Sequence, residues 1–150
     1  MTKLRKPEYG FGMHLMVDGY GCDRSRLEDL SLIYNFLSEY PAHMGMTKIM
    51  PPYVFRYDGA NKPEDWGISG FVLIAESHIS IHTFPDKGYL SLDIFSCKNF
   101  DAARAIAYVE KMFAVAKSET KVLDRGLEFP KNIRVTARIV QEDRLRAEPC

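Results

Sequence analysis

The stretch from Glu76 to Cys97 limits the fold of this chain more than any other part of the sequence. Two runs of alternating apolar and polar residues flank a short Pro-Asp-Lys-Gly connection, which is typical of a strand, a turn and a second strand. Gly88 suits the turn because glycine adopts backbone angles that other residues avoid. With these four residues as the loop, Phe84 pairs with Tyr89 and Glu76 pairs with Cys97.

The two faces of this predicted hairpin differ in their chemistry. One face is apolar and is predicted to lie in the core: Ile79, Ile81, Thr83, Leu90, Leu92 and Ile94. The other face is polar: His78, Ser80, His82, Ser91, Asp93 and Cys97. Imidazoles, hydroxyls, a carboxylate and a thiol are too polar for an ordinary core and too reactive for an ordinary wet face. The polar face is therefore predicted to carry the chemistry of the protein.

Length and charge narrow the class of function. A chain of 150 residues is expected to form one domain, residues 1–150, that buries roughly 70% of the surface of the unfolded chain. Lysine and arginine total 20 and aspartate and glutamate total 20, so no net charge attracts nucleic acid or an anionic membrane. No apolar stretch of signal-peptide length follows the basic residues 3–6, and no run approaches membrane-spanning length, so neither a signal peptide nor a membrane span is expected. We expect a cytoplasmic protein with a small-molecule partner.

The cysteines and histidines do not form a metal-binding pattern. Cys22, Cys97 and Cys150 are odd in number and scattered, which favours reduced thiols and leaves Cys97 free to act. His78 and His82 are four residues apart, and on a strand this spacing separates them by roughly 13 Å. No metal is therefore expected.

The rest of the chain is predicted to complete a layered domain. The expected strands are residues 13–17, 46–57, 68–75, 121–127 and 133–140, besides the hairpin. One helix is expected from the cap Asp23 through Tyr40, with Pro41 marking its end, and another after Asn99 or Asp101. His14 reads as an ordinary strand residue. This order predicts an α+β fold with a mainly antiparallel sheet and two helices on one face.

Residues 67–97 resemble the bacterial and archaeal S-adenosylmethionine decarboxylases. The resemblance rests on the pattern Glu-Ser-His-x-x-x-His-Thr, on the cysteine that follows it and on the preceding Gly-Ile-Ser-Gly. More loosely it extends to Gly12-Met13-His14-Leu15, Gly21-Cys22-Asp23 and Asp124-Arg125-Gly126. It implies a proenzyme that cleaves itself between Glu76 and Ser77 into residues 1–76 and 77–150. Ser77 would become a pyruvoyl group, the enzyme's own cofactor.

The resemblance also implies roles for individual residues. The residue matching Ser69 assists processing, and the residue matching His82 is the base that removes the α-proton of Ser77. The pyruvoyl carbonyl would form a Schiff base with the substrate amine and accept the electrons released with carbon dioxide. Cys97 matches the proton donor. Residues five apart on a regular strand point to opposite faces, so uniting Ser77 with His82 would need a bulge or a turn.

Substrate binding is expected near the turn of the hairpin. The sulfonium and adenine of S-adenosylmethionine need an aromatic face, and its ribose needs a carboxylate, for which Phe84 and Asp86 are the candidates. A second aromatic residue is either Phe55 or Tyr57, because the loop over residues 58–66 is longer than the family pattern needs. The product would be the aminopropyl donor of polyamine synthesis, including spermidine.

The resemblance further implies a homodimer in which two sheets face each other. Two alternatives to this function stay open on the sequence. The same pyruvoyl chemistry would act on arginine or ornithine instead, and Asp86 or Asp58 would then hold the guanidinium group of arginine. A non-enzymatic ligand-binding protein with the same fold is the other alternative, and an uncleaved chain would favour it.

Overall fold

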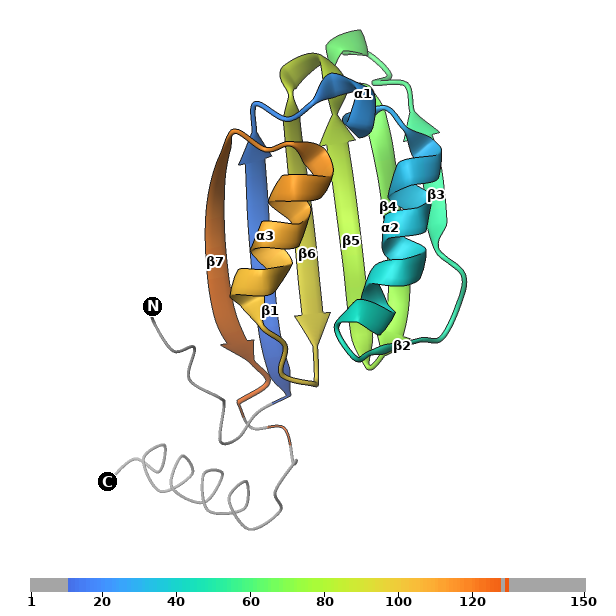
Figure 1. The fold of residues 1–150 in the computed structure, drawn as a ribbon. Coiled ribbons are helices and arrows are strands. Elements are labelled where there is room, and N and C mark those ends of the chain that lie inside the picture. Colours follow the sequence, from blue (N-terminus) through green and yellow to red (C-terminus); the bar gives the residue numbers. More distant parts are fainter. Residues whose placement is uncertain (1–10, 128, 130–150) are drawn as a thin grey trace, which may run out of the picture.

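The computed structural model describes residues 11–127 and 129. Its main feature is one antiparallel sheet of seven strands, drawn as arrows in Figure 1. The strands are β1 (Gly12–Tyr20), β2 (Thr47–Lys48), β3 (Tyr53–Tyr57), β4 (Gly67–Ala75), β5 (Ser77–Phe84), β6 (Tyr89–Ser96) and β7 (Lys117–Arg125). Their order across the sheet is β2-β4-β5-β6-β1-β7, and β3 also pairs with β4. The predicted hairpin, β5 and β6, therefore lies at the centre.

The α-helices of the described chain cover one face of this sheet (Figure 1). They are α1 (Arg24–Leu27), α2 (Leu30–His43) and α3 (Ala102–Phe113). Each begins at an aspartate whose side chain accepts a hydrogen bond from a backbone N–H in the first turn: Asp23, Asp29 and Asp101. Two short 3₁₀ turns, η1 (Pro63–Asp65) and η2 (Pro85–Lys87), lie at the end of the sheet where α1 sits.

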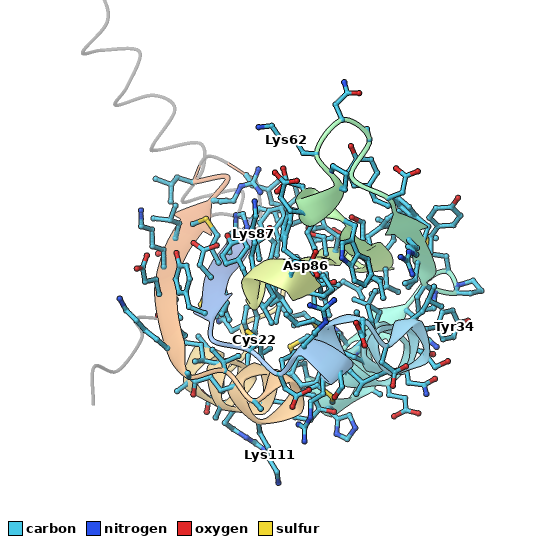
Figure 2. All side chains as sticks on the ribbon, turned by 90° about the horizontal axis from the view of Figure 1, so that it is seen from above. Cys22, Tyr34, Lys62, Asp86, Lys87 and Lys111 are labelled. Atoms are coloured by element: carbon cyan, nitrogen blue, oxygen red, sulfur yellow. The ribbon has the colours of Figure 1, made fainter. Side chains whose placement is uncertain are left out.

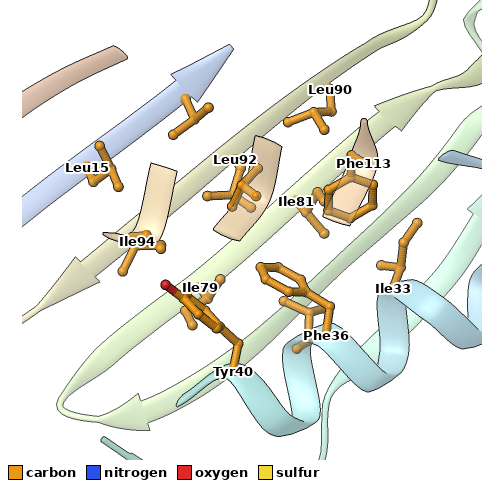
Figure 3. Close-up of a cluster of buried hydrophobic side chains, with 14 of the residues drawn as sticks. Leu15, Ile33, Phe36, Tyr40, Ile79, Ile81, Leu90, Leu92, Ile94 and Phe113 are labelled. Carbon is orange, nitrogen blue, oxygen red and sulfur yellow. The ribbon is translucent and has the colours of Figure 1, made fainter. Parts of the chain in front are cut away.

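The core lies between the helices and the sheet (Figure 3). The apolar face predicted for the hairpin is buried at all six positions, including Thr83. It packs against helix residues such as Phe36 of α2 and Phe113 of α3, whose rings meet edge to face at 5.9 Å. Burial of one face of each strand fixes the register, because a slip of one residue would turn the apolar side chains outward.

The structure confirms the predicted α+β class, the antiparallel sheet and the helices on one face. It also confirms the hairpin register, since Phe84 pairs with Tyr89, His82 with Ser91 and Ser80 with Asp93. Gly88 has φ +59°, which is the left-handed conformation the turn requires. The alternating pattern was sufficient here because both strands have one buried face.

The predicted helix from Asp23 through Tyr40 is wrong in two respects. It is interrupted after Leu27, because Asp29 caps a new helix. It also continues past Pro41 to His43, since a proline in the last turn removes a single hydrogen bond. Gly45, with φ +72°, follows the helix end instead.

Two strand predictions also need correction, and a third is not tested. The strand predicted over 46–57 is two strands, β2 and β3, separated by a segment that contains Pro51 and Pro52 and is therefore a poor strand former. The strand predicted over 121–127 begins earlier, at Lys117, and ends at Arg125. The strand predicted over 133–140 lies outside the described residues. Among the described helices, none is long and apolar enough to cross a membrane.

Candidate active site

The face of the sheet that carries no helix presents the predicted polar residues. His78, Ser80 and His82 alternate with buried isoleucines along β5, and Ser91 and Asp93 face the same side from β6. We call this the uncovered face. In Figure 2, which views the sheet from the η2 end, the helix residues Tyr34 and Lys111 lie on one side and Lys62 lies on the other. The loop over residues 58–66 therefore projects on the side away from the helices.

The turn between β4 and β5 holds the predicted cleavage site. Ser77 has φ +126°, a conformation that residues with side chains rarely adopt. The backbone N–H of Cys97 donates to the carbonyl oxygen of Glu76 at 3.3 Å, and the N–H of Glu76 lies 3.4 Å from Cys97 Sγ. The predicted pairing of Glu76 with Cys97 is confirmed. We call Glu76, Ser77 and Cys97 the hairpin-end cluster.

Gly12 makes the close packing at this end possible. A Cβ at position 12 would lie 1.8 Å from the carbonyl oxygen of Ser96 and 2.8 Å from Cα of Cys97. A side chain would therefore displace the strand end that carries the thiol. This gives a physical reason for a glycine in the first, looser part of the motif.

A second pair of functional side chains lies farther along β5. Ser69 of β4 pairs with His82 of β5, and Ser69 Oγ lies 2.8 Å from His82 Nδ1. Phe55 of β3 pairs with Ser69 on its other side and is 43% exposed. The structure thus brings together the serine and the histidine that the motif assigned to processing. We call Ser69 and His82 the mid-strand pair.

The mid-strand pair does not reach the cleavage site within one chain. His82 is five residues beyond Ser77 on β5, and five residues of strand span roughly 16 Å. The turn before Ser77 changes the backbone at that residue but does not shorten this distance. No bulge or turn in the described residues therefore brings Ser77 and His82 together.

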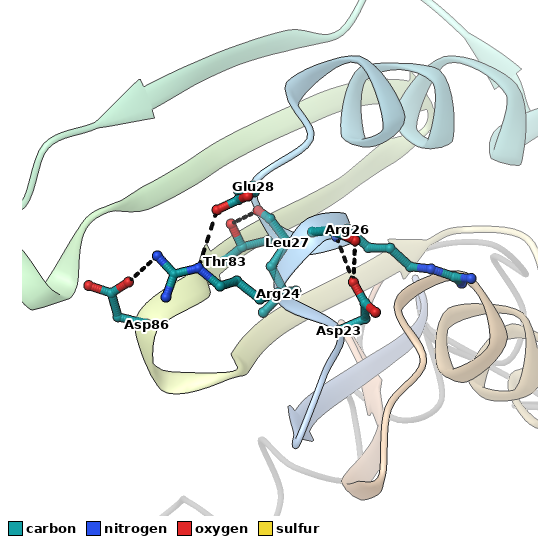
Figure 4. A network of polar contacts seen from close by, with 8 residues as sticks. Asp23, Arg24, Arg26, Leu27, Glu28, Thr83 and Asp86 are labelled. Atoms are coloured by element: carbon teal, nitrogen blue, oxygen red, sulfur yellow. Dashed lines mark hydrogen bonds and ion pairs between the residues drawn. The ribbon is translucent and has the colours of Figure 1, made fainter.

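The predicted substrate-binding residues gather at the far end of β5. Phe84 ends the strand, with its ring 5.5 Å from that of Tyr89, and Asp86 follows in η2. Asp86 Oδ1 lies 2.8 Å from Nη2 of Arg24, as Figure 4 shows. Tyr57 is 46% exposed at the end of β3 and pairs with Gly67. Neither Phe55 nor Tyr57 is buried, and both alternate with Val54, which packs against the core.

The loop over residues 58–66 is attached to the same end of the sheet. Lys87 of η2 forms an ion pair with Asp65. The guanidinium of Arg56 lies 4.3 Å from the ring centre of Trp66, so this tryptophan packs on a neighbouring side chain. The loop therefore lies beside η2, the turn that contains Asp86, at this end of the sheet.

Sequence reasoning missed a polar network on the uncovered face. His14 Nε2 lies 2.8 Å from Asp93 Oδ1, so it is not an ordinary strand residue. Burial, followed by the nearby His14, lowers the pKa of His78, whose ring meets Phe95 edge to face at 5.8 Å. The available signal was the position of His14 between the apolar Met13 and Leu15, because the period of a strand puts it on the face opposite to theirs.

Fold and site together define a class of protein. A helix-covered antiparallel sheet carries Ser77 at a strained turn, next to Glu76, whose N–H lies 3.4 Å from a thiol, and a serine–histidine pair on its bare face. These are the groups a self-processing, thiol-assisted decarboxylase requires.

Comparison with known proteins identifies the family. The S-adenosylmethionine decarboxylase family matches residues 13–126. Curated relatives described as S-adenosylmethionine decarboxylase proenzyme include that of Pyrococcus horikoshii, 34% identical over 78% of this chain and 80% of that protein. The same description belongs to the protein of Clostridium botulinum strain Loch Maree, 34% identical over 77% of this chain and 94% of that protein. The chain therefore belongs to the S-adenosylmethionine decarboxylase family, as the motif predicted.

A solved structure agrees with this assignment. The adenosylmethionine decarboxylase of Aquifex aeolicus superposes with a TM-score of 0.67 at 28% identity, over 79% of this chain and 92% of that one. The family match over residues 13–126 includes the helices and strands described above, except for Gly12 at the start of β1.

Proposed function

We propose that this protein is a proenzyme that cleaves itself between Glu76 and Ser77 and then decarboxylates S-adenosylmethionine. The two chains would be residues 1–76 and 77–150, and the product would be the aminopropyl donor for polyamines such as spermidine. Membership of the family supports this carboxy-lyase activity. The observation that carries the proposal is the hairpin-end cluster, in which Ser77 occupies a strained turn directly after Glu76, the residue that contacts Cys97.

Cleavage needs a hydroxyl that attacks the preceding carbonyl and a donor for the oxygen that becomes negative. Ser77 supplies the hydroxyl next to the Glu76 carbonyl. The N–H of Cys97, 3.3 Å from that oxygen, supplies a backbone donor where charge develops. The left-handed backbone of Ser77 costs on the order of 1–3 kcal/mol, and breaking the peptide bond would release this strain.

The hairpin-end cluster also fits the pyruvoyl group that Ser77 would become. Cleavage makes residue 77 a new N-terminus, still held by β-pairing of β5 with β6. A pyruvoyl group supplies the electron sink for removing carbon dioxide from an amino acid. Cys97 lies across the turn from this position, with its Sγ 3.4 Å from the Glu76 N–H, and we assign it the delivery of a proton to the former α-carbon.

The uncovered face supports a homodimer in which two sheets face each other. It exposes six large apolar or aromatic side chains of β3, β4 and β7: Tyr53, Phe55, Tyr57, Phe71, Leu73 and Leu123. Contiguous exposed apolar area marks a protein contact, and the helices already cover the other face. A second copy with the same face buries these side chains symmetrically.

The same dimer would complete the active site. Two-fold symmetry with the sheets face to face would place the hairpin end of one subunit against the middle of its partner's β5. The partner subunit's Ser69 and His82 would then reach Ser77, about 16 Å from the His82 of its own chain. The base that removes the Ser77 α-proton is thus assigned to the partner's His82.

S-adenosylmethionine fits the far end of β5 better than arginine or ornithine does. Phe84 with Phe55 or Tyr57 offers aromatic faces for adenine, and Asp86 offers an acceptor for the ribose hydroxyls. Asp86 already pairs with the guanidinium of Arg24, and Asp58 accepts the N–H of Ala60 at 3.0 Å. Both carboxylates proposed for a guanidinium substrate therefore have donors of their own.

Denaturing mass spectrometry of the purified protein tests the proposal. We expect two fragments that divide at the Glu76–Ser77 bond, the second without a free amino group, and a single intact chain for Ser77→Ala. An intact wild-type chain after prolonged incubation would overturn it. Parallel assays of carbon dioxide release from S-adenosylmethionine, arginine and ornithine decide the substrate.

A further inference from the structure

We propose that Arg24 is a positioning residue for the substrate, which holds the carboxylate of Asp86 in its binding orientation. The inference rests on the proposed contact between Asp86 and the ribose hydroxyls. It also gives a purpose to α1, a single helical turn with no role in the chemistry so far described.

The contact itself is direct. Arg24 Nη2 lies 2.8 Å from Asp86 Oδ1, and its Nε lies 3.5 Å from Oε2 of Glu28 (Figure 4). The side chains of Arg24 and Asp86 are 60% and 34% exposed, so the pair adds little to stability in water. Its consequence is instead geometric, because the ion pair holds the side chain of Asp86 in one orientation at the short 3₁₀ turn.

The backbone that carries Arg24 is anchored on both sides. Arg26 donates from Nη1 to the carbonyl oxygens of Lys111 and Met112, each at 2.8 Å, which ties α1 to the end of α3. Asp23 caps the turn by accepting the N–H of Arg26. A helix of one turn is unstable alone, so these contacts are what keep Arg24 in place.

The other anchor comes from the catalytic strand. Thr83 is 2% exposed, and its hydroxyl donates to the carbonyl oxygen of Leu27 at 2.8 Å and accepts the N–H of Ile68 at 3.0 Å. Thr83 directly follows His82 in the family motif, yet the chemistry assigns it no step. The structure assigns it the fastening of α1 to β5, so that one strand positions both His82 and, through α1 and Arg24, Asp86.

The two carboxylate oxygens of Asp86 would have different partners, and this explains how positioning would help substrate binding. A carboxylate accepts about four hydrogen bonds through its two oxygens. The guanidinium of Arg24 engages Oδ1, which leaves Oδ2 for the ribose hydroxyls. Fixing the side chain before the substrate arrives avoids the loss of rotational freedom on binding.

Steady-state kinetics of cleaved, dimeric enzyme tests the inference. For Arg24→Gln we expect the KM for S-adenosylmethionine to rise roughly 3- to 10-fold, with little change in kcat and with the wild-type extent of self-cleavage. Arg24→Lys should recover part of the loss. Glu28→Gln is the matched control, because it removes the other partner of Arg24 and leaves the Asp86 contact in place; its KM should equal that of the wild type.

A double-mutant cycle with Asp86→Asn separates the possible failures. If Arg24 acts through Asp86, adding Arg24→Gln to Asp86→Asn changes KM no further. Additive effects, an unchanged KM in Arg24→Gln, or a fall in kcat or cleavage equal to the rise in KM would overturn the inference. A wild-type KM for Asp86→Asn alone would instead overturn the ribose contact in the proposed function.

Discussion

The two ends of β5 differ in what they offer to a reaction. At the start of the strand, Ser77 has a strained backbone and follows Glu76, whose N–H lies 3.4 Å from the thiol of Cys97. Toward the other end, the backbone is regular, and the functional groups are the hydrogen-bonded Ser69 and His82, followed by Phe84. In the proposed function, the first end contains the bond to be broken, and the second contains the base and the binding surface.

This difference teaches that, if the proposed roles hold, one chain contains two separate halves of the site. The rigid pairing of β5 with β4 and β6 keeps the halves about 16 Å apart, and no side chain spans that distance. In the proposed dimer, each copy would supply one half to the other. The predictions below separate the two ends experimentally.

The largest expected effect concerns complementation between inactive chains. Ser77→Ala and His82→Ala chains, each expressed alone, should remain uncleaved. When the two are co-expressed with different tags, the His82→Ala chain should be cleaved, because its intact Ser77 meets the partner's His82 in the mixed dimer. Mass spectrometry of the separated chains measures this. If neither chain is cleaved in a verified mixed dimer, His82 of one chain does not act on Ser77 of the other, and the proposed arrangement is wrong.

A smaller effect is expected at the hairpin end once cleavage has occurred. Cys97→Ala keeps its backbone N–H, so it should still cleave, but decarboxylation should slow by roughly 10²- to 10⁴-fold because its proton donor is gone. Cys22→Ala is a matched control, since that thiol is buried beside Gly88 at the opposite end of the sheet. Wild-type turnover in Cys97→Ala, without inactivation by abortive proton transfer, would remove the assigned role.

The smallest expected effect is a pH dependence of the free energy of unfolding, caused by His78 next to the hairpin-end cluster. Burial and the charge of His14 lower the pKa of His78 below its usual 6.5 in the folded chain. The unfolded chain therefore binds a proton first as the pH falls below 6.5, so the free energy of unfolding should decrease between pH 7 and pH 5. Urea unfolding of the uncleaved Ser77→Ala chain measures it. His78→Gln in the same background should show a shallower decrease, and an identical slope would contradict the cause.

Part of this protein follows from local sequence. The alternation over 76–84 and 89–97 determined the hairpin, its register and its two faces, because a strand with one buried face tolerates no slip. The motif Glu-Ser-His-x-x-x-His-Thr also indicated the family, which the match over residues 13–126 confirms.

Element boundaries followed from the sequence less well. Asp29 and Asp23 are both good caps, and only the docking of α1 onto Thr83 and α3 decided that two helices form rather than one. Pro41 was compatible with a helix end or a last helical turn, and its burial against the core favoured the second. Local propensity is weak compared with the packing of an apolar side chain.

The contacts that join distant segments were decided by the tertiary structure alone. His14 meets Asp93 across 79 positions, and Arg24 meets Asp86 across 62, because strand order and helix docking place β1 beside β6 and α1 beside η2. The sequence by itself determined which residues have the required chemistry and which face they share. The fold determined how far apart they lie, since a paired strand is rigid and its length sets the separation of Ser77 from His82.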